Sequence, residues 1–575
     1  MRATTTSILF GLALSTTAAL TLSARQTARP VDDALLVAAP AGEWLTHGRD
    51  YAETHHSPLT RIDQSNVARL KPVWSVEVGS KGKIETTPIV ANGVLFGTST
   101  WNVVYAVDAR TGVLKWRWDP ALVQGGYAEG GPRYCCGPVN RGVAYYKGRI
   151  YVGLLDGRLV ALDAETGHVS WSVQTTPVGK DYSITGAPRI VKGRVVIGNG
   201  GGEYGVRGYL TAYDADSGKQ AWRWFVVPGD PSKGLEDRSM EMALKSWKGQ
   251  WFKYGGGGTP WDGLAYDPDA NLVYVGTGNG SPWSRDHRSP GGGDNLYLSS
   301  IVALNADTGR YVWHYQTTPG DDWDYNAAQQ MILTTLTING KPRQVLLQAP
   351  KNGFFYVLDR LTGELLSAQP FTTVTWATHI DLKTGRPVET PEARYGVKGS
   401  RLAPSAVGAH HWPPMAFNPA TGLVYFPGQD TAMVYRSTEK FDFQEGQWNT
   451  GTSLGGAAAA AIASAPAPPP PPTPTPGGRR GFFLAWDPAA NKERWRIEFS
   501  PSGGALSTAG QLVFVGDSGG AFMALDPATG KTLWEHKLMA GVATPVSYEL
   551  DGKQYVAVMS GIANGKVFAF TLDGQ

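Results

Sequence analysis

The sequence is almost free of cysteine, since Cys135 and Cys136 are the only two among 575 residues. A c-type haem is attached through a C-x-x-C-H motif, which two adjacent cysteines cannot supply, so no covalent haem is expected. Neighbouring Cα atoms lie about 3.8 Å apart, which is below the usual span of a disulfide. The residues alone therefore leave two possibilities open: a strained vicinal disulfide, or two unlinked thiols in a buried turn.

Clusters of basic residues are also lacking. The net charge is only +3, and no dense run of Lys and Arg occurs. Nucleic acid is therefore not expected as a partner. The chain has no G-x-G-x-x-G motif in a βαβ context either, so a nicotinamide dinucleotide is not an expected cofactor.

No apolar run reaches the roughly 20 residues that a transmembrane helix needs. The apolar stretch 8–22 follows Arg2 and ends among small residues, which is typical of a secretory signal peptide. We expect residues 1–24, approximately, to be removed and the product to reach the periplasm without a transmembrane segment. In that oxidising compartment a bridge between the two cysteines can form and persist.

Glycine and tryptophan, by contrast, are abundant, with 72 and 20 residues. Short apolar runs alternate with Gly, Asn-Gly and Asp-Gly, and stretches with helical periodicity are scarce. Such runs indicate strands joined by tight turns, which predicts an all-β chain.

One sequence unit recurs six times. It begins with Ala, has Asp or Asn at its third position and has Trp ten residues after the Ala, with Thr-Gly or a near equivalent between them in five copies. The copies are residues 106–116, 161–171, 212–222, 303–313, 485–495 and 524–534. We expect the Asp or Asn to cap a turn, the Gly to adopt positive φ, and the Trp to return on the next strand as a buried wedge between sheets.

Weaker copies begin at Ala265, Val357 and Ala416, so that turns recur roughly every 40 to 70 residues. This spacing predicts an eight-bladed β-propeller with Trp-docking repeats that fills residues 40–575 as one domain. We expect the two ends of the chain to complete one blade together. The Ala/Pro-rich segment 456–478 cannot pack as a strand and is expected to be a low-complexity insertion of polyproline type.

Further motifs accompany the repeat. They are Ile84-Glu85-Thr-Thr-Pro, Cys135-Cys136-Gly-Pro-Val-Asn-Arg141-Gly, Thr185-Gly-Ala-Pro, Gly198-Asn-Gly-Gly201-Gly202-Glu203, Trp261, Gly276-Thr-Gly-Asn279, Asp322-Trp-Asp324-Tyr and Lys351-Asn-Gly. Together they resemble the pyrroloquinoline quinone (PQQ)-dependent alcohol dehydrogenases, the quinoprotein family of eight-bladed propellers. The resemblance extends over nearly the whole mature chain and implies that the propeller binds PQQ.

The resemblance implies a set of cofactor contacts. In the family a vicinal disulfide, here Cys135–Cys136, lies on one face of the quinone and a Trp, here Trp261, lies on the other. The implied PQQ-binding residues are Glu85, Cys135, Cys136, Arg141, Thr185, Gly201, Gly202, Trp261 and Lys351.

The resemblance also implies a metal site and a catalytic base. Glu203, Asn279 and Asp324 match the calcium ligands, and Asp324 matches the residue that removes the hydroxyl proton. Oxygen ligands drawn from separate blades suit a hard cation, although each of these residues alone could be an ordinary turn residue. Lanthanide-using relatives carry a second Asp two residues after the catalytic one; here that position is Asn326, so we expect Ca²⁺.

The chain departs from the family pattern around the substrate. The segment at 561–565 lacks a Trp that many relatives have, which suggests a pocket for a bulky alcohol. The expected pocket residues are Trp283, His411 and Trp412.

We expect an alcohol dehydrogenase without a fused cytochrome domain, because the sequence stops soon after the last predicted strand. A separate soluble c-type cytochrome is then the expected electron acceptor. Two alternatives remain: a PQQ-dependent sugar or polyol dehydrogenase, and a non-catalytic propeller scaffold.

Overall fold

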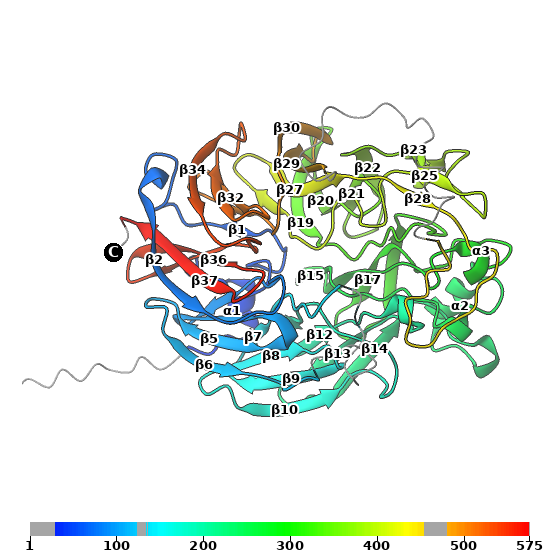
Figure 1. Ribbon diagram of the computed structural model, residues 1–575, viewed down its shortest axis with the longest axis horizontal. Helices are drawn as coiled ribbons and strands as arrows, with labels where there is room; N and C mark the ends of the chain where they lie inside the picture. Colours follow the sequence, from blue (N-terminus) through cyan, green and yellow to red (C-terminus); the bar gives the residue numbers. More distant parts are fainter. Residues whose placement is uncertain (1–28, 124–133, 135, 454–479, 574–575) are drawn as a thin grey trace, which may run out of the picture.

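The computed structural model describes residues 29–123, 134, 136–453 and 480–573. In this part of the chain, eight antiparallel sheets of four strands, one of them extended by a short fifth strand, follow one another in chain order around a ring (Figure 1). This confirms the predicted eight-bladed β-propeller. The expected signal peptide and the Ala/Pro-rich segment 456–478 lie outside the described residues.

Blades 1 to 4 each use four consecutive strands. Blade 1 consists of β3 (Ile89–Ala91), β4 (Val94–Thr98), β5 (Val104–Asp108) and β6 (Leu114–Trp118), and blade 2 of β7 (Ala144–Tyr146), β8 (Arg149–Gly153), β9 (Arg158–Asp163) and β10 (Val169–Gln174). Blade 3 consists of β11 (Arg189–Val191), β12 (Arg194–Ile197), β13 (Tyr209–Asp214) and β14 (Gln220–Phe225), and blade 4 of β15 (Leu264–Asp267), β16 (Leu272–Gly276), β17 (Ser300–Asn305) and β18 (Tyr311–Gln316).

Blades 5 to 7 continue the ring. They are β19 (Ile332–Ile338), β20 (Lys341–Gln348), β21 (Phe354–Asp359) and β22 (Leu365–Pro370); β26 (Ala416–Asn418), β27 (Leu423–Asp430), β29 (Arg480–Asp487) and β30 (Lys492–Glu498); and β31 (Leu506–Thr508), β32 (Leu512–Gly516), β33 (Ala521–Leu525) and β34 (Thr532–Lys537), with β1 (His56–Ser57) added in parallel to β31.

Blade 8 is built from both ends of the chain. Its strands are β35 (Val546–Leu550), β36 (Lys553–Ser560), β37 (Lys566–Leu572) and β2 (Leu70–Glu77). Figure 1 shows the red β37 lying beside the blue β2. The prediction that the two ends complete one blade is confirmed.

Short elements lie in the loops between the blade strands. The hairpin of β23 (Ala377–Asp381) and β24 (Arg386–Glu389) follows blade 5, and β25 (Ser400–Leu402), which precedes blade 6, pairs with β28 (Met433–Tyr435), which lies between β27 and β29. The helices are α1 (Asp33–Val37), α2 (Arg238–Leu244) and α3 (Arg285–Arg288), and the 3₁₀ turns are η1 (Val67–Arg69), η2 (Thr100–Asn102), η4 (Gly202–Tyr204), η5 (Pro231–Lys233) and η6 (Trp251–Tyr254).

In blades 1 to 4, 6 and 7 the repeated Trp contacts the next blade. Trp116 of blade 1 donates from Nε1 to the carbonyl of Ala164 in blade 2, over 3.0 Å. Its ring covers Gly167, where φ is +75° and an added Cβ would lie 2.8 Å from the indole, so only glycine fits. Trp171, Trp222, Trp495 and Trp534 make the same kind of bond to the following blade. The predicted wedge is confirmed, although most of these indoles are only half-buried.

The predicted turn caps are also present. Asp108 accepts from the backbone N–H of Thr111 over 2.9 Å, and Asp163, Asp214, Asn305 and Asp526 cap their turns in the same way. The nine predicted turns do not each mark a separate blade, because blades 4 and 6 contain two of them each. In blade 4 these are the copies beginning at Ala265 and Ala303, and in blade 6 those beginning at Ala416 and Ala485. The turn count alone therefore overstates the number of blades.

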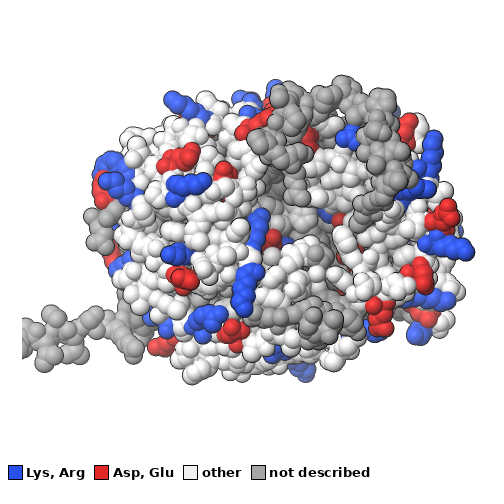
Figure 2. Space-filling view, in the orientation of Figure 1, with Lys and Arg blue, Asp and Glu red and all other residues white. Residues whose placement is uncertain are grey.

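The surface carries charges of both signs. On the face shown in Figure 2, Lys and Arg side chains are interspersed with Asp and Glu, and the described residues form no large patch of one sign. None of the described helices has the length and apolar character that crossing a bilayer would require.

Candidate active site

A cavity of about 720 Å³ lies where loops from all eight blades meet. The loops that lead into the innermost strands supply most of its wall. From blade 1 to blade 8, each of these loops contributes one of the following residues: Lys83, Arg141, Thr185, Trp261, Asp324, Trp412, Ser502 and Gly541. The inner strands of the eight blades thus place eight separate loops around one cavity.

Most of the predicted site residues line this cavity. They are Cys136, Arg141, Thr185, Gly201, Glu203, Trp261, Asn279, Trp283, Asp324, Lys351, His411 and Trp412. Glu85 and Gly202 are not among the described lining residues; Glu85 lies behind Arg141, and Gly202 is buried in η4. Cys135 lies outside the described residues, so its bridge to Cys136 stays a prediction.

Asp324 and Lys351 form a buried ion pair in the cavity wall. Lys351 Nζ donates to Asp324 Oδ2 over 2.8 Å, and the Lys351 side chain is only 3% exposed. Asn326 Nδ2 donates to the other oxygen, Oδ1, over 3.1 Å. Asp324 has φ of +65°, a left-handed conformation that few residues adopt and that is often found at functional positions.

The surroundings of Asp324 suit a proton acceptor. Burial raises the pKa of its carboxyl group to about 7, with a further contribution from the negative charge of Glu203 and an opposing one from Lys351. A carboxylate whose pKa lies near the working pH can take up a proton and release it again. This property and its position in a cavity mark Asp324 as a candidate general base.

Glu203 and Asn279 lie together beside this pair. Asn279 Nδ2 lies 2.8 Å from Glu203 Oε1, and Trp283 Nε1 donates to the same oxygen over 3.1 Å. Glu203 comes from blade 3, Asn279 from blade 4 and Asp324 from the loop into blade 5. Two carboxylates and one amide can each offer an oxygen atom as a metal ligand, which fits a hard divalent cation of the calcium type.

Arg141 provides a positive charge in the cavity wall. Its guanidinium donates to Thr185 Oγ1 over 2.7 Å and lies 2.9 Å from Glu85 Oε2. Asp262 Oδ2 lies 3.7 Å from Arg141 Nε. The Arg141 side chain is only 5% exposed, and a guanidinium fixed in this way suits an anionic group such as a carboxylate.

Aromatic rings form the flat surfaces of the cavity. His411 stacks on Trp261, with ring centroids 5.3 Å apart and planes inclined by 20°. Arg141 Cζ lies 5.0 Å from the centre of the Trp261 ring, and Lys83 Nζ lies 4.7 Å from that of Trp412. Flat rings together with fixed cations suit a planar ligand that carries several negative charges.

Comparison with known proteins identifies the family. A profile of the PQQ family described as "Glucose/ethanol/alcohol dehydrogenase, beta-propeller domain" matches residues 44–374 and 484–556. The chain belongs to the PQQ-dependent alcohol dehydrogenases.

Individual relatives agree with this assignment. The chain is 50% identical over 537 residues to quinohemoprotein alcohol dehydrogenase ADH IIB of Pseudomonas putida, a match that covers 92% of this chain and 75% of that one. It is 45% identical over 561 residues to a 1-butanol dehydrogenase (cytochrome c) of Thauera butanivorans, covering 93% and 79%.

Solved structures have the same fold. The quinohemoprotein alcohol dehydrogenase of Comamonas testosteroni matches with a TM-score of 0.87 at 46% identity, covering 94% of this chain and 82% of that one. A europium-containing methanol dehydrogenase matches with a TM-score of 0.84 at 33% identity, covering 94% and 100%. PQQ is a planar molecule with three carboxyl groups, which accords with the flat walls and fixed cations of this cavity.

Two charged residues at this cavity were not predicted from the sequence. Lys83 lies two residues before Glu85 and lines the cavity, where burial lowers its pKa. Asp262 directly follows Trp261 and faces Arg141. The signal in both cases was proximity to a named motif, but a single Lys or Asp next to a motif is indistinguishable from a solvated loop charge.

Proposed function

We propose that the protein oxidises an alcohol to an aldehyde or ketone in the periplasm, with PQQ and Ca²⁺ bound in the cavity. The buried Asp324–Lys351 pair beside Glu203 and Asn279 is the observation that carries this proposal. It combines a candidate base, a fixed positive charge and a set of oxygen ligands for a cation in one cavity.

When bound, PQQ would supply the acceptor of a hydride from the alcohol carbon, and Ca²⁺ would supply a Lewis acid. Glu203, Asn279 and Asp324 would hold the cation. Arg141 and Thr185 would bind a carboxylate of the cofactor, and Trp261 would support one face of its ring, opposite the predicted Cys135–Cys136 disulfide.

Asp324 would accept the hydroxyl proton of the substrate. Lys351 Nζ already donates to Oδ2, which fixes the orientation of the carboxylate and balances its charge. As the alcohol is oxidised, Lys351 would remain in place to stabilise negative charge that develops on the cofactor.

The outer part of the cavity favours an apolar and bulky substrate. Val407, Trp448 and Ile562 line it and are nevertheless 46%, 47% and 57% exposed. Large apolar side chains left open to water around a cavity favour binding of an apolar group. We therefore propose an alcohol larger than methanol or ethanol.

The electrons would pass to a separate soluble c-type cytochrome. Support for this acceptor comes from the Thauera relative, whose name is 1-butanol dehydrogenase (cytochrome c). The expected exported location accords with this acceptor.

Reconstitution of the purified apoprotein tests the proposal. PQQ and Ca²⁺ added together should restore dye-linked oxidation of a C4–C8 alcohol, whereas either alone should not. An aldose panel run in parallel tests the sugar dehydrogenase alternative. Absence of PQQ retention on gel filtration, or turnover of aldoses but not alcohols, would contradict the proposal.

A further inference from the structure

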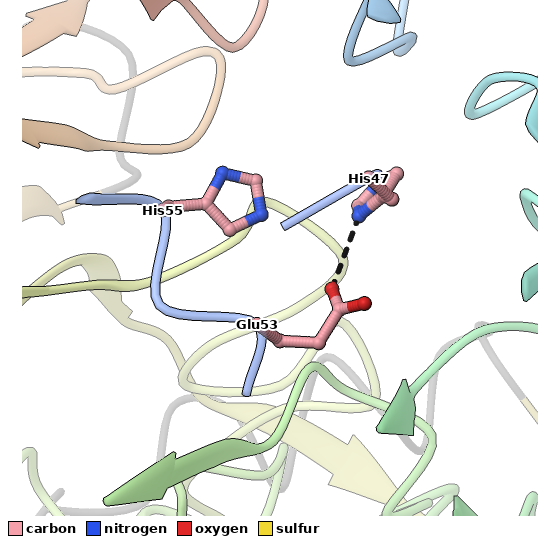
Figure 3. Close-up of side chains that lie close together, drawn as sticks. All are labelled: His47, Glu53 and His55. Carbon is pink, nitrogen blue, oxygen red and sulfur yellow. Dashed lines mark hydrogen bonds and ion pairs between the residues drawn. The ribbon is translucent and has the colours of Figure 1, made fainter. Parts of the chain in front are cut away.

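A second cluster of potential metal ligands lies outside the active site. His47, Glu53 and His55 are 6%, 2% and 0% exposed. One ligand atom of each residue lies within 4.8 Å of those of the other two. Figure 3 shows the three side chains gathered in one space, with one ring nitrogen of His55 facing His47 and Glu53.

The segment that carries the cluster runs through the centre of the ring. Its backbone carbonyls accept hydrogen bonds from residues in the innermost strands of four blades. The pairs are Tyr266 N to Tyr51 O, Leu333 N to Ala52 O, Phe417 N to Thr54 O and Ser507 N to His55 O. The ligand geometry is therefore fixed by the propeller itself and not by a free loop.

Glu53 is further held by its neighbours. Arg189, at the start of β11, donates to both carboxylate oxygens over 2.6 and 3.1 Å. Gln330 donates to the Glu53 backbone carbonyl over 2.5 Å. Each carboxylate oxygen has two lone pairs, so Arg189 orients the group and leaves acceptor capacity on both oxygens.

His55 has no hydrogen-bond partner at either ring nitrogen within the described part of the chain. Its ring only makes edge contacts with Trp44 and His47. Such a buried imidazole is costly, because its polar atoms have lost water and gained nothing in exchange. By contrast His410, equally enclosed, has backbone carbonyls within 2.6 and 2.8 Å of its two ring nitrogens.

His47 is also poorly paired. Its Nδ1 lies 3.4 Å from Glu53 Oε2, which is long for a hydrogen bond. Imidazole binds metals in its neutral form, through a ring nitrogen that carries no proton.

We propose that His47, Glu53 and His55 bind a divalent transition-metal ion, such as Zn²⁺, at the centre of the propeller. Two imidazoles and one carboxylate are typical ligands of zinc, cobalt and ferrous iron, and they are poor ligands for Ca²⁺. This site is separate from the cation site at Glu203. Because Arg189 partly neutralises Glu53, the two imidazoles would supply most of the affinity, and the ion would bind as the chain folds.

The test is metal analysis of the folded protein expressed in zinc-supplemented medium. After gel filtration in Ca²⁺-containing buffer, the wild type should hold about one zinc per chain. The variant His47→Asn with His55→Asn should hold at least tenfold less. His56→Asn is the matched control, since His56 contacts Ser507 and not the cluster, and it should keep the metal.

A spectrum gives a second measurement that does not depend on the double variant folding. Protein expressed with Co²⁺ should show intense visible d–d bands of a low-coordinate site, and the bands should be lost in His55→Gln. Wild type that is folded but holds no transition metal would overturn the proposal and would leave a bound water as the partner of His55. Equal metal content in the wild type and the double variant would overturn it too.

Discussion

Trp74 of β2 is paired with Ala569 of β37, so the same Ala–Trp pairing that recurs inside other blades is formed in blade 8 between opposite ends of the chain. Trp74 also covers Gly112 of blade 1, where an added Cβ would lie 2.8 Å from the indole. One side chain thus completes blade 8 and fixes it to its neighbour.

Trp74→Ala should lower the free energy of unfolding by about 2–4 kcal/mol, somewhat less than a fully buried Trp would cost. Trp448→Ala serves as the control, since Trp448 is 47% exposed and its loss should change stability by no more than about 0.5 kcal/mol. Chemical denaturation of both variants checks this. Equal stability of the two would show that the ring does not depend on this closure.

Asp324→Asn should reduce turnover of the reconstituted enzyme by about 10²–10⁴-fold, because the amide cannot accept the hydroxyl proton. PQQ retention should remain, as the amide keeps an oxygen for the cation. Asp381→Asn, in an exposed hairpin turn, is the control. Steady-state rates and cofactor absorbance measure the two effects, and unchanged turnover would remove Asp324 from the role of base.

Ca²⁺ should activate the apoprotein with PQQ more strongly than La³⁺. Asn326 donates to Asp324 and accepts from Gln329 Nε2 over 2.9 Å, so this position supplies no extra negative charge for a trivalent ion. Parallel titrations with the two ions measure the preference. Asn326→Asp should shift it toward La³⁺, and higher wild-type activity with La³⁺ would contradict the assignment of calcium.

Replacement of Cys135 and Cys136 by Ser should weaken PQQ retention while the fold persists, if the predicted bridge serves as a rigid support and not as a redox relay. Spectroscopic measurement of PQQ after gel filtration shows the loss. Thiol titration of the native, unreduced protein provides an independent check, since two free thiols would refute the bridge.

Acidification should destabilise the protein as the pH falls from about 6.5 toward 4. Burial lowers the pKa of His56 and of His314 to about 4, so the unfolded chain binds protons that the folded one does not. Each residue contributes up to about 1.4 kcal/mol per pH unit in that window. The variant His56→Gln with His314→Gln should lose stability less steeply in melts at several pH values.

The fold was largely predictable because its unit is local. Ala106 and Trp116 lie ten residues apart and face each other across one turn, so the pattern is visible in the sequence. Trp74 carries the same contact but was not recognised as a copy, because its partner lies at the far end of the chain. Periodic patterns report neighbours along the chain and not those brought together by closure of the ring.

Residues of the cavity that lie in recognisable motifs could be predicted from the sequence, and residues outside such motifs could not. Asp324, Glu203 and Asn279 occur in recognisable motifs and line one cavity, while their roles as ligands and base stay predictions. His47 and His55 gave no comparable signal, because nothing in the segment that carries them shows that it crosses the centre of the propeller. Only the positions of the surrounding strands reveal that cluster.

The Trp docking contacts join neighbouring blades along the outer strands, whereas the loops that bear Val407, Trp448 and Ile562 converge on the cavity. The residues that join the blades and the residues that line the outer cavity thus occupy separate parts of the molecule. Substitutions in the cavity wall can therefore accumulate without breaking the contacts between blades, so this architecture can reshape its cavity while it keeps its fold.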